Sequence, residues 1–222
     1  NRNKPILIIL FLFAAACALD HAAMMGALAD PALGVHLGFA LILLLISLIG
    51  GRITPAFTRN WLMRRGGSEG LPTLPNRFDM AVIGATALAL AAWVAEPASA
   101  IAAGLLIAAG VLQFIRLARW AGMKALSDPL VFVLHISYAW LPTGLILLGC
   151  ATLHPVLPVS SAIHALGAGA MGAMPLAGLT RATRGHTGCP LEADRATVLI
   201  YILVHAGALL RVVAPLLPFD YL

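Results

Sequence analysis

Seven long runs of apolar residues, separated by short polar loops, are the feature of this sequence that most restricts its fold. About 20 apolar residues in a helix cover the hydrocarbon core of a bilayer, and the runs approach or reach that length. They cover residues 5–19 (extending toward Ala29), 32–50, 79–95, 97–117, 128–150, 158–179 and 196–216. No alternation of apolar and polar residues competes with this pattern. We therefore predict an all-α transmembrane bundle of about seven spans, forming one domain over residues 1–222.

The charge content agrees with a membrane location. Only 10% of the residues are charged and the mean hydropathy is +0.95, whereas a soluble domain has about 25% charged residues. The net charge of +5 does not indicate nucleic-acid binding, because the basic residues stand in short loops between the apolar runs.

The distribution of basic residues predicts the orientation. With the N-terminus inside, thirteen of the 14 lysines and arginines fall on the inner side, as the positive-inside rule requires. They are Arg2, Lys4, Arg52, Arg59, Arg64, Arg65, Arg77, Arg116, Arg119, Lys124, Arg181, Arg184 and Arg195. This orientation places the C-terminus outside and a polar loop, residues 51–77, inside. We expect Gly50 and Gly51 to end the second helix and Pro55 to enforce a turn.

Four histidines lie inside the apolar runs, where an ionisable side chain is costly and usually has a partner or a function. His36 and His164 are nearly level, about 6 and 9 Å below the outer ends of their helices. His135 lies deeper, and we interpret His205 as a packing residue because apolar residues surround it. A hydrogen-bonded packing role is the alternative for each of the others.

Imidazole is a common axial ligand of haem iron and also suits copper. Gly34 and Gly38 flank His36, and a glycine- and alanine-rich segment follows His164, so a flat macrocycle has room beside both helices. We predict His36 and His164 as metal or haem ligands, with His135 as the next candidate or as a group that supports a ligand.

A second polar group is predicted at the inner surface, formed by Arg52, Arg59, Arg181 and His186. One interpretation is membrane topology together with lipid headgroup contact. The other is anion binding, including the propionates of a haem. We expect these four residues to form one patch, separate from the outer-half histidines.

Three motifs occur in a distinctive order: GGRITPAFTRNWL (50–62), LHISYAWLPTGL (134–145) and HALGAGAMGAMPLAGLTRATRGHTGCPL (164–191). Together they resemble the NnrS family from about Leu37 to Arg211. The matching positions are Arg52, Pro55, Thr58, Arg59, His135, His164, Arg181, Gly185, His186 and Gly188. The resemblance implies a multi-pass protein of the bacterial inner membrane that contains haem and copper and takes part in nitric oxide metabolism and the nitrosative-stress response. Because the histidine-rich motif of the family's N-terminal half is absent, the sequence resembles the C-terminal portion of a longer protein.

The expected function is therefore that of a membrane protein binding haem b and copper, with nitric oxide or a related small ligand, the lipid bilayer and the N-terminal half as partners. A nitric-oxide-related redox activity, as in denitrification, stays open. The alternatives are a secondary transporter, because polar residues in short helices also line substrate paths, and a non-catalytic membrane scaffold.

The orientation is testable by cysteine accessibility. In a variant whose three native cysteines are replaced by serine, a single cysteine at Gly67 should be protected from a membrane-impermeant thiol reagent in intact cells, because the predicted loop faces inward. Ready labelling before lysis would reverse the predicted orientation.

Overall fold

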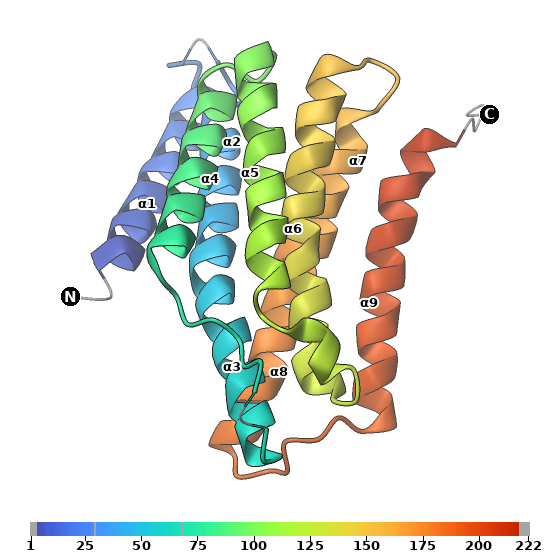
Figure 1. Ribbon diagram of the computed structural model, residues 1–222. Helices are drawn as coiled ribbons and strands as arrows, with labels where there is room; N and C mark the ends of the chain where they lie inside the picture. The colour runs from blue at the N-terminus through green and yellow to red at the C-terminus, as the bar shows by residue number, and fades with distance from the viewer. Residues whose placement is uncertain (1–3, 29, 68, 218–222) are drawn as a thin grey trace.

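The computed structural model describes residues 4–28, 30–67 and 69–217, and the regular secondary structure in this part of the chain is helical (Figure 1). Seven helical segments there are long and apolar enough to cross a membrane. The prediction of an all-α bundle with seven spans is therefore confirmed, and the chain is a multi-pass membrane protein. Arg2, Ala29 and the C-terminus, which the sequence analysis used, lie outside the described residues.

The helices follow one another up and down through the bundle. They are α1 (Lys4–Met24), α2 (Leu33–Leu45), η1 (Ile46–Gly50), α3 (Gly51–Arg64), α4 (Arg77–Ala95), α5 (Ala100–Ala118), η2 (Gly122–Ala125), α6 (Pro129–Leu153), α7 (Val159–His164), η3 (Ala165–Ala173), α8 (Met174–His186), α9 (Arg195–Val213) and η4 (Ala214–Leu216). Side chains of Asn76, Ser99, Asp128 and Asp194 accept backbone N–H groups at the starts of α4, α5, α6 and α9, which stabilises those helix ends.

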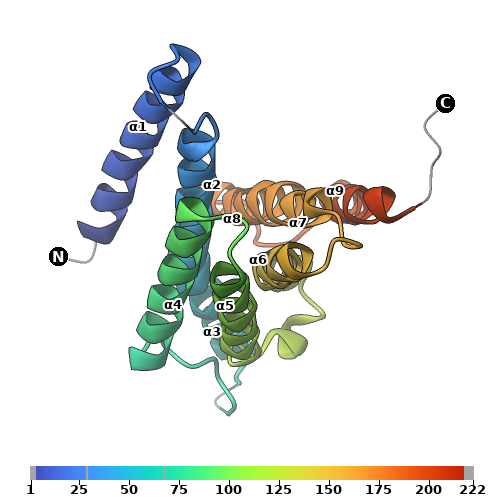
Figure 2. The same ribbon diagram turned by 90° about the horizontal axis from the view of Figure 1, so that it is seen from above.

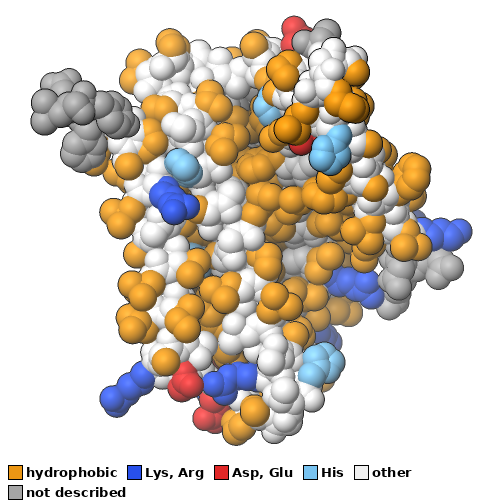
Figure 3. All heavy atoms as spheres, turned by 180° about the vertical axis from the view of Figure 1, so that it is seen from behind, with side chains coloured by type: hydrophobic (Ala, Val, Ile, Leu, Met, Phe, Trp, Pro, Cys, Tyr) orange, Lys and Arg blue, Asp and Glu red, His pale blue; other side chains and the backbone are white. Residues whose placement is uncertain are grey.

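Helix α6 lies at the centre, and α1 and α9 lie at the two flanks (Figure 2). Its leucines Leu130, Leu134, Leu141 and Leu145 are completely buried. The flanking helices instead expose apolar side chains such as Phe11, and hydrophobic atoms cover most of the height of the bundle's rear face (Figure 3). An exposed apolar surface of this extent is stable where lipid surrounds it.

The prediction that the helix ends at Gly50 and Gly51 and that Pro55 enforces a turn is wrong. Helix α2 continues through the π-helical stretch η1 into α3, so that residues Leu33–Arg64 form one helical segment and Pro55 lies inside a helix. A proline disrupts a helix by removing one backbone hydrogen bond and by crowding the carbonyl four residues earlier. Here the regular α-helical ladder is already interrupted directly before Gly51, so the chain accommodates the ring without a turn.

The sixth span also combines a π-helical stretch with a proline in the helix that follows. The π-helical stretch η3 joins α7 to α8, and Pro175 stands at the start of α8. The helix ends at His186, seven residues beyond the predicted boundary at 179, and Gly188 follows with a φ of +71°, a conformation typical of residues after helix ends. Helices α3 and α8 both project past the bundle at the lower end of Figure 1.

A buried ion pair connects the helices at the inner side. The Nε of Arg116 donates to Oδ1 of Asp79 at 2.8 Å. Its Nη1 donates to the carbonyl oxygen of Ser47 at 2.9 Å and to the hydroxyl of Tyr138 at 3.0 Å. Asp79 also accepts the N–H of Asn76 at 3.0 Å through its other oxygen. One guanidinium thus contacts η1, α4 and α6 while belonging to α5.

An amide extends this network one turn deeper. The Nε2 of Gln113 donates to Oγ of Ser47 at 2.6 Å and to Oγ1 of Thr86 at 2.9 Å. Its Oε1 accepts the hydroxyl of Tyr138 at 2.7 Å. These side chains and Arg116 are at most 2% exposed, and unpaired polar groups at such positions are costly. The hydrogen bonds therefore fix the relative positions of four helical elements.

Replacing Asp79 by asparagine should destabilise the bundle strongly, because Arg116 would keep a buried charge without a counterion. Removing one partner of a buried pair costs about 3–5 kcal/mol. Thermal unfolding of the purified protein in detergent measures this effect, with Glu96→Gln, which removes an exposed carboxylate, as the matched control. Equal midpoints for the two variants would contradict the structural role of the pair.

Candidate functional site

Two of the four intramembrane histidines lack a side-chain hydrogen-bond partner among the described residues. His36 packs its ring against Trp93, with the ring centroids 4.7 Å apart, and its Nδ1 is buried without a partner in this part of the chain. His164, the last residue of α7, is half-buried and likewise makes no side-chain hydrogen bond there. Neither imidazole is therefore held in place by a hydrogen bond to these residues.

The predicted equal depth of this pair follows from one helix contact. A Cβ built on Gly167 would lie 4.0 Å from the Phe39 ring, so α2 and η3 meet at these residues. His36 and His164 each precede this contact by three residues, or about 4.5 Å of helix. Because both spans run in the same direction through the bundle (Figure 1), the two imidazoles stand at a similar level along it.

The space predicted beside them is only partly open. A Cβ on Gly34 would collide with the α1 backbone near Asp20, and a Cβ on Gly169 would meet the indole of Trp140 at 2.5 Å. These glycines serve close helix packing. Gly167 has only the Phe39 ring nearby, so clearance for a flat group remains on the η3 side.

His135 is enclosed by protein. Its Nε2 lies 2.8 Å from Oγ1 of Thr58, and that hydroxyl donates to the carbonyl of Thr54 at 2.8 Å. With the hydroxyl proton used there, Nε2 carries the imidazole proton and donates to Thr58. A Cβ on Gly122 would lie 2.6 Å from Nδ1, and Trp120 lies edge-on to the ring at 6.5 Å between centroids. This environment fits a packing role.

Both ring nitrogens of His205 are also used. Trp140 donates its indole N–H to Nδ1 at 3.0 Å, and Nε2 lies 3.4 Å from the hydroxyl oxygen of Ser137. Because Nδ1 accepts, the proton resides on Nε2. These contacts join α9 to α6 and agree with the interpretation of His205 as a packing residue.

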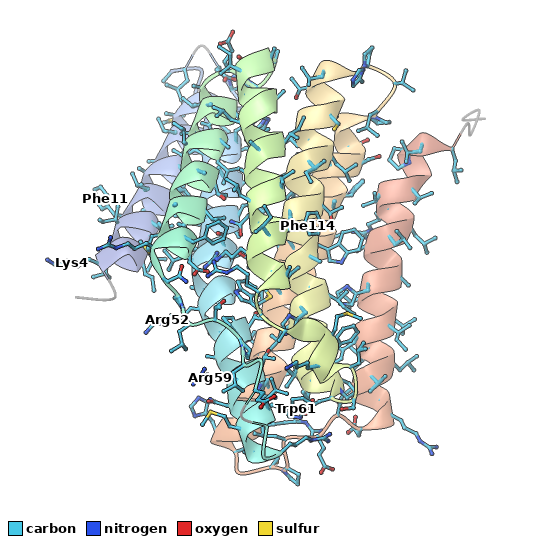
Figure 4. All side chains as sticks on the ribbon, in the orientation of Figure 1. Lys4, Phe11, Arg52, Arg59, Trp61 and Phe114 are labelled. Carbon is cyan, nitrogen blue, oxygen red and sulfur yellow. The ribbon has the colours of Figure 1, made fainter. Side chains whose placement is uncertain are left out.

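The four residues predicted to form one inner patch come from two helices, α3 and α8, and are found on different sides of α3. Arg52 and Arg59 are two turns apart, and both side chains leave α3 on the side away from α9 (Figure 4). Arg181 instead lies over the ring of Phe57, 4.8 Å from its centroid, and His186 is exposed at the end of α8. The structure brings Arg52 and Arg59 to one surface and places Arg181 at another.

Arg181 is the least satisfied of these groups. It is 4% exposed, and its Nη1 is buried with no hydrogen-bond partner among the described residues. It follows His164 by 17 residues of helix, or roughly 25 Å. A haem macrocycle is about 10 Å across, so His164 and Arg181 cannot hold the same one by its iron and its propionates.

A helix-capping hydrogen bond and an ion pair connect the start of α9 to the end of α8. Asp194 accepts the N–H of Thr197 at 2.7 Å and lies 3.4 Å from Nη2 of Arg184. The hydrogen bonds from Thr197 lower the pKa of the Asp194 carboxyl. It therefore stays ionised at neutral pH and pairs with the end of α8.

Sequence reasoning missed the network around Arg116, which it treated only as a marker of topology. Gln113 and Arg116 stand one turn apart in an otherwise apolar helix, and Asp79 lies in the first turn of another. That spacing is a signal for a polar face inside the bundle.

The seven apolar spans define a multi-pass membrane protein. The profile of the family described as NnrS protein matches residues 1–222, and the chain belongs to this family. The match extends beyond the stretch that carried the sequence resemblance. Comparison with curated proteins and with solved structures finds no match.

The assignment of His135 to packing predicts the effect of Thr58→Val. Valine keeps the shape but leaves Nε2 of His135 unpaired, which should cost about 1–3 kcal/mol of stability. Thr143→Val is the control, because Thr143 bonds only to the carbonyl of Ala139 within its own helix. Thermal unfolding midpoints of the two variants would be compared, and an unchanged midpoint for Thr58→Val would argue against the bond.

Proposed function

We propose that this chain is a haem b-binding protein of the bacterial inner membrane that acts in nitric oxide metabolism or in the nitrosative-stress response. Membership of the NnrS family and the seven apolar spans support this proposal. The ligands we assign are His36 and His164, on neighbouring helices in the outer half of the bundle.

One observation carries the assignment: the hydrogen bonding of the four intramembrane histidines divides them into two pairs. Nε2 of His135 and both ring nitrogens of His205 have partners within the protein. Within the described residues, His36 and His164 do not, although an unpaired imidazole at membrane depth is costly. Coordination of haem iron would use both imidazoles and offset that cost. Nitric oxide would bind such an iron only by replacing one of the two histidines.

Copper fits less well. No group of three or more histidine, cysteine, aspartate or glutamate side chains lies close enough to hold a metal ion among the described residues. Met171, a possible soft donor, lines a hollow with Gly38 and Phe39 of α2 and with Asp20 of α1. Copper bound to the family's proteins would need donors from elsewhere, and we assign it no residue in this chain.

Single replacements of His36 and His164 by alanine should each reduce the haem content of the purified full-length protein, because each would remove an axial ligand. Haem is quantified from the absorption spectrum and metals by elemental analysis. His205→Ala is the control: it removes another intramembrane imidazole, one that already has protein partners, so haem should be retained.

Full haem content in both His36→Ala and His164→Ala would overturn the assignment. A shift of the Soret band on addition of nitric oxide would support the proposed role. A colourless, metal-free protein that takes up a substrate would instead indicate a transporter, and a protein with neither property would indicate a scaffold.

A further inference from the structure

A hollow between α3, α4 and α5 lies apart from the histidines and goes beyond the proposed function. We propose that it binds the phosphate headgroup of an anionic phospholipid from the inner leaflet. Its volume is about 630 Å³. The residues that matter to the argument are Leu48, Gly51, Arg52, Asp79, Met80 and Arg116, all of which line it.

Its depth matches the level of lipid phosphates. Arg52 follows Leu33, the first residue of its span, by 19 residues, which corresponds to about 28 Å of helix. The hydrocarbon core of a bilayer is about 30 Å thick. By its distance along the span, Arg52 therefore stands where hydrocarbon gives way to headgroups.

The floor of the hollow holds a guanidinium group with a free side. Arg116 uses Nε and Nη1 for Asp79, Ser47 and Tyr138. Within the described residues its Nη2 makes no hydrogen bond, although the residue is 2% exposed. A Cβ on Gly51 would collide with Nη2. Only glycine at this position leaves room for the guanidinium in its observed place at the floor of the hollow.

The charge of the hollow favours an anion. Arg52 and Arg116 line it, and Nη1 of Arg119 lies 3.8 Å from Oδ2 of Asp79. The hollow is thus lined by two cations and one carboxylate, and a third cation, Arg119, stands beside that carboxylate, so the four groups carry a net charge of two positive units. Guanidinium groups bind phosphate oxygens through paired hydrogen bonds, and such basic pockets at the cytoplasmic side of membrane helices suit lipid headgroups.

The apolar walls of the hollow favour a lipid over a free anion as its ligand. Around the guanidinium groups, the hollow is lined by the apolar side chains of Leu48, Ala56, Leu74, Met80 and Ile83. Met80 is 64% exposed on the outer surface of α4, where acyl chains would pass. An amphiphile satisfies both the charged floor and the apolar walls, whereas a small oxyanion satisfies only the floor.

The test compares Arg52→Gln with Arg77→Gln in the purified full-length protein. Both variants remove one positive charge from the same surface, but Arg77 does not line the hollow. Thermal unfolding is measured in neutral detergent while phosphatidylglycerol or phosphatidylcholine is titrated in. Phosphatidylglycerol should raise the midpoint of wild type and Arg77→Gln, as a ligand specific for the folded state does, and the shift should be lost in Arg52→Gln.

Gly51→Ala should also abolish the shift, since its methyl group displaces Nη2 of Arg116. Equal shifts for all variants would show non-specific attraction and overturn the proposal. Equal shifts from phosphatidylcholine would remove the selectivity for net negative charge and overturn it as well. If millimolar inorganic phosphate reproduces the shift in an Arg52-dependent manner, the site binds a free oxyanion and the lipid is excluded as its ligand.

Discussion

The bundle depends on one buried ion pair, that of Arg116 with Asp79. Two charges close to the hydrocarbon boundary lose most of their hydration, and their attraction offsets that loss only when the remaining donors and acceptors are also satisfied. Ser47 and Tyr138 accept hydrogen bonds from the guanidinium, and Gln113 in turn bonds to both of these residues. The energetic requirement of one guanidinium therefore sets the relative register of η1, α4, α5 and α6, and it forms the floor of the inner hollow.

Two helices at one end of the bundle, α3 and α8, are reached through the same backbone arrangement. In both long segments a π-helical stretch precedes a proline-containing helix that extends past the nearby ends of α4 and α5 (Figure 1). Extra residues in a helical turn often mark functional regions, because they redirect side chains without ending the helix. Here the arrangement places Arg52 and Arg181 at the inner boundary while His36 and His164 stay on the same continuous segments in the outer half.

The apolar runs were sufficient to predict the spans, because length and hydropathy alone decide whether a helix crosses a bilayer. The helix through Pro55 was not predictable from local signals, because Gly50, Gly51 and Pro55 all favour termination. Gly51 instead provides room for Arg116, a residue 65 positions away in the sequence. The hydrogen bond between Thr58 and His135 likewise depends on tertiary packing, which local sequence signals do not reveal.

The stretch η3 has a consequence for how the sixth span faces its neighbours. Each residue of an α-helix advances the side-chain direction by about 100°, and a π-helical turn holds one more residue than an α-helical turn. Over Ala165–Ala173 the directions of successive side chains therefore depart from those of a regular α-helix. A helical wheel drawn through this span assigns Met171 and Arg181 to the wrong faces relative to His164. The nine residues of η3 set the direction in which the side chains of α8 point. Deleting one residue there would rotate all of α8 about its axis relative to α7 while leaving the composition of α8 unchanged.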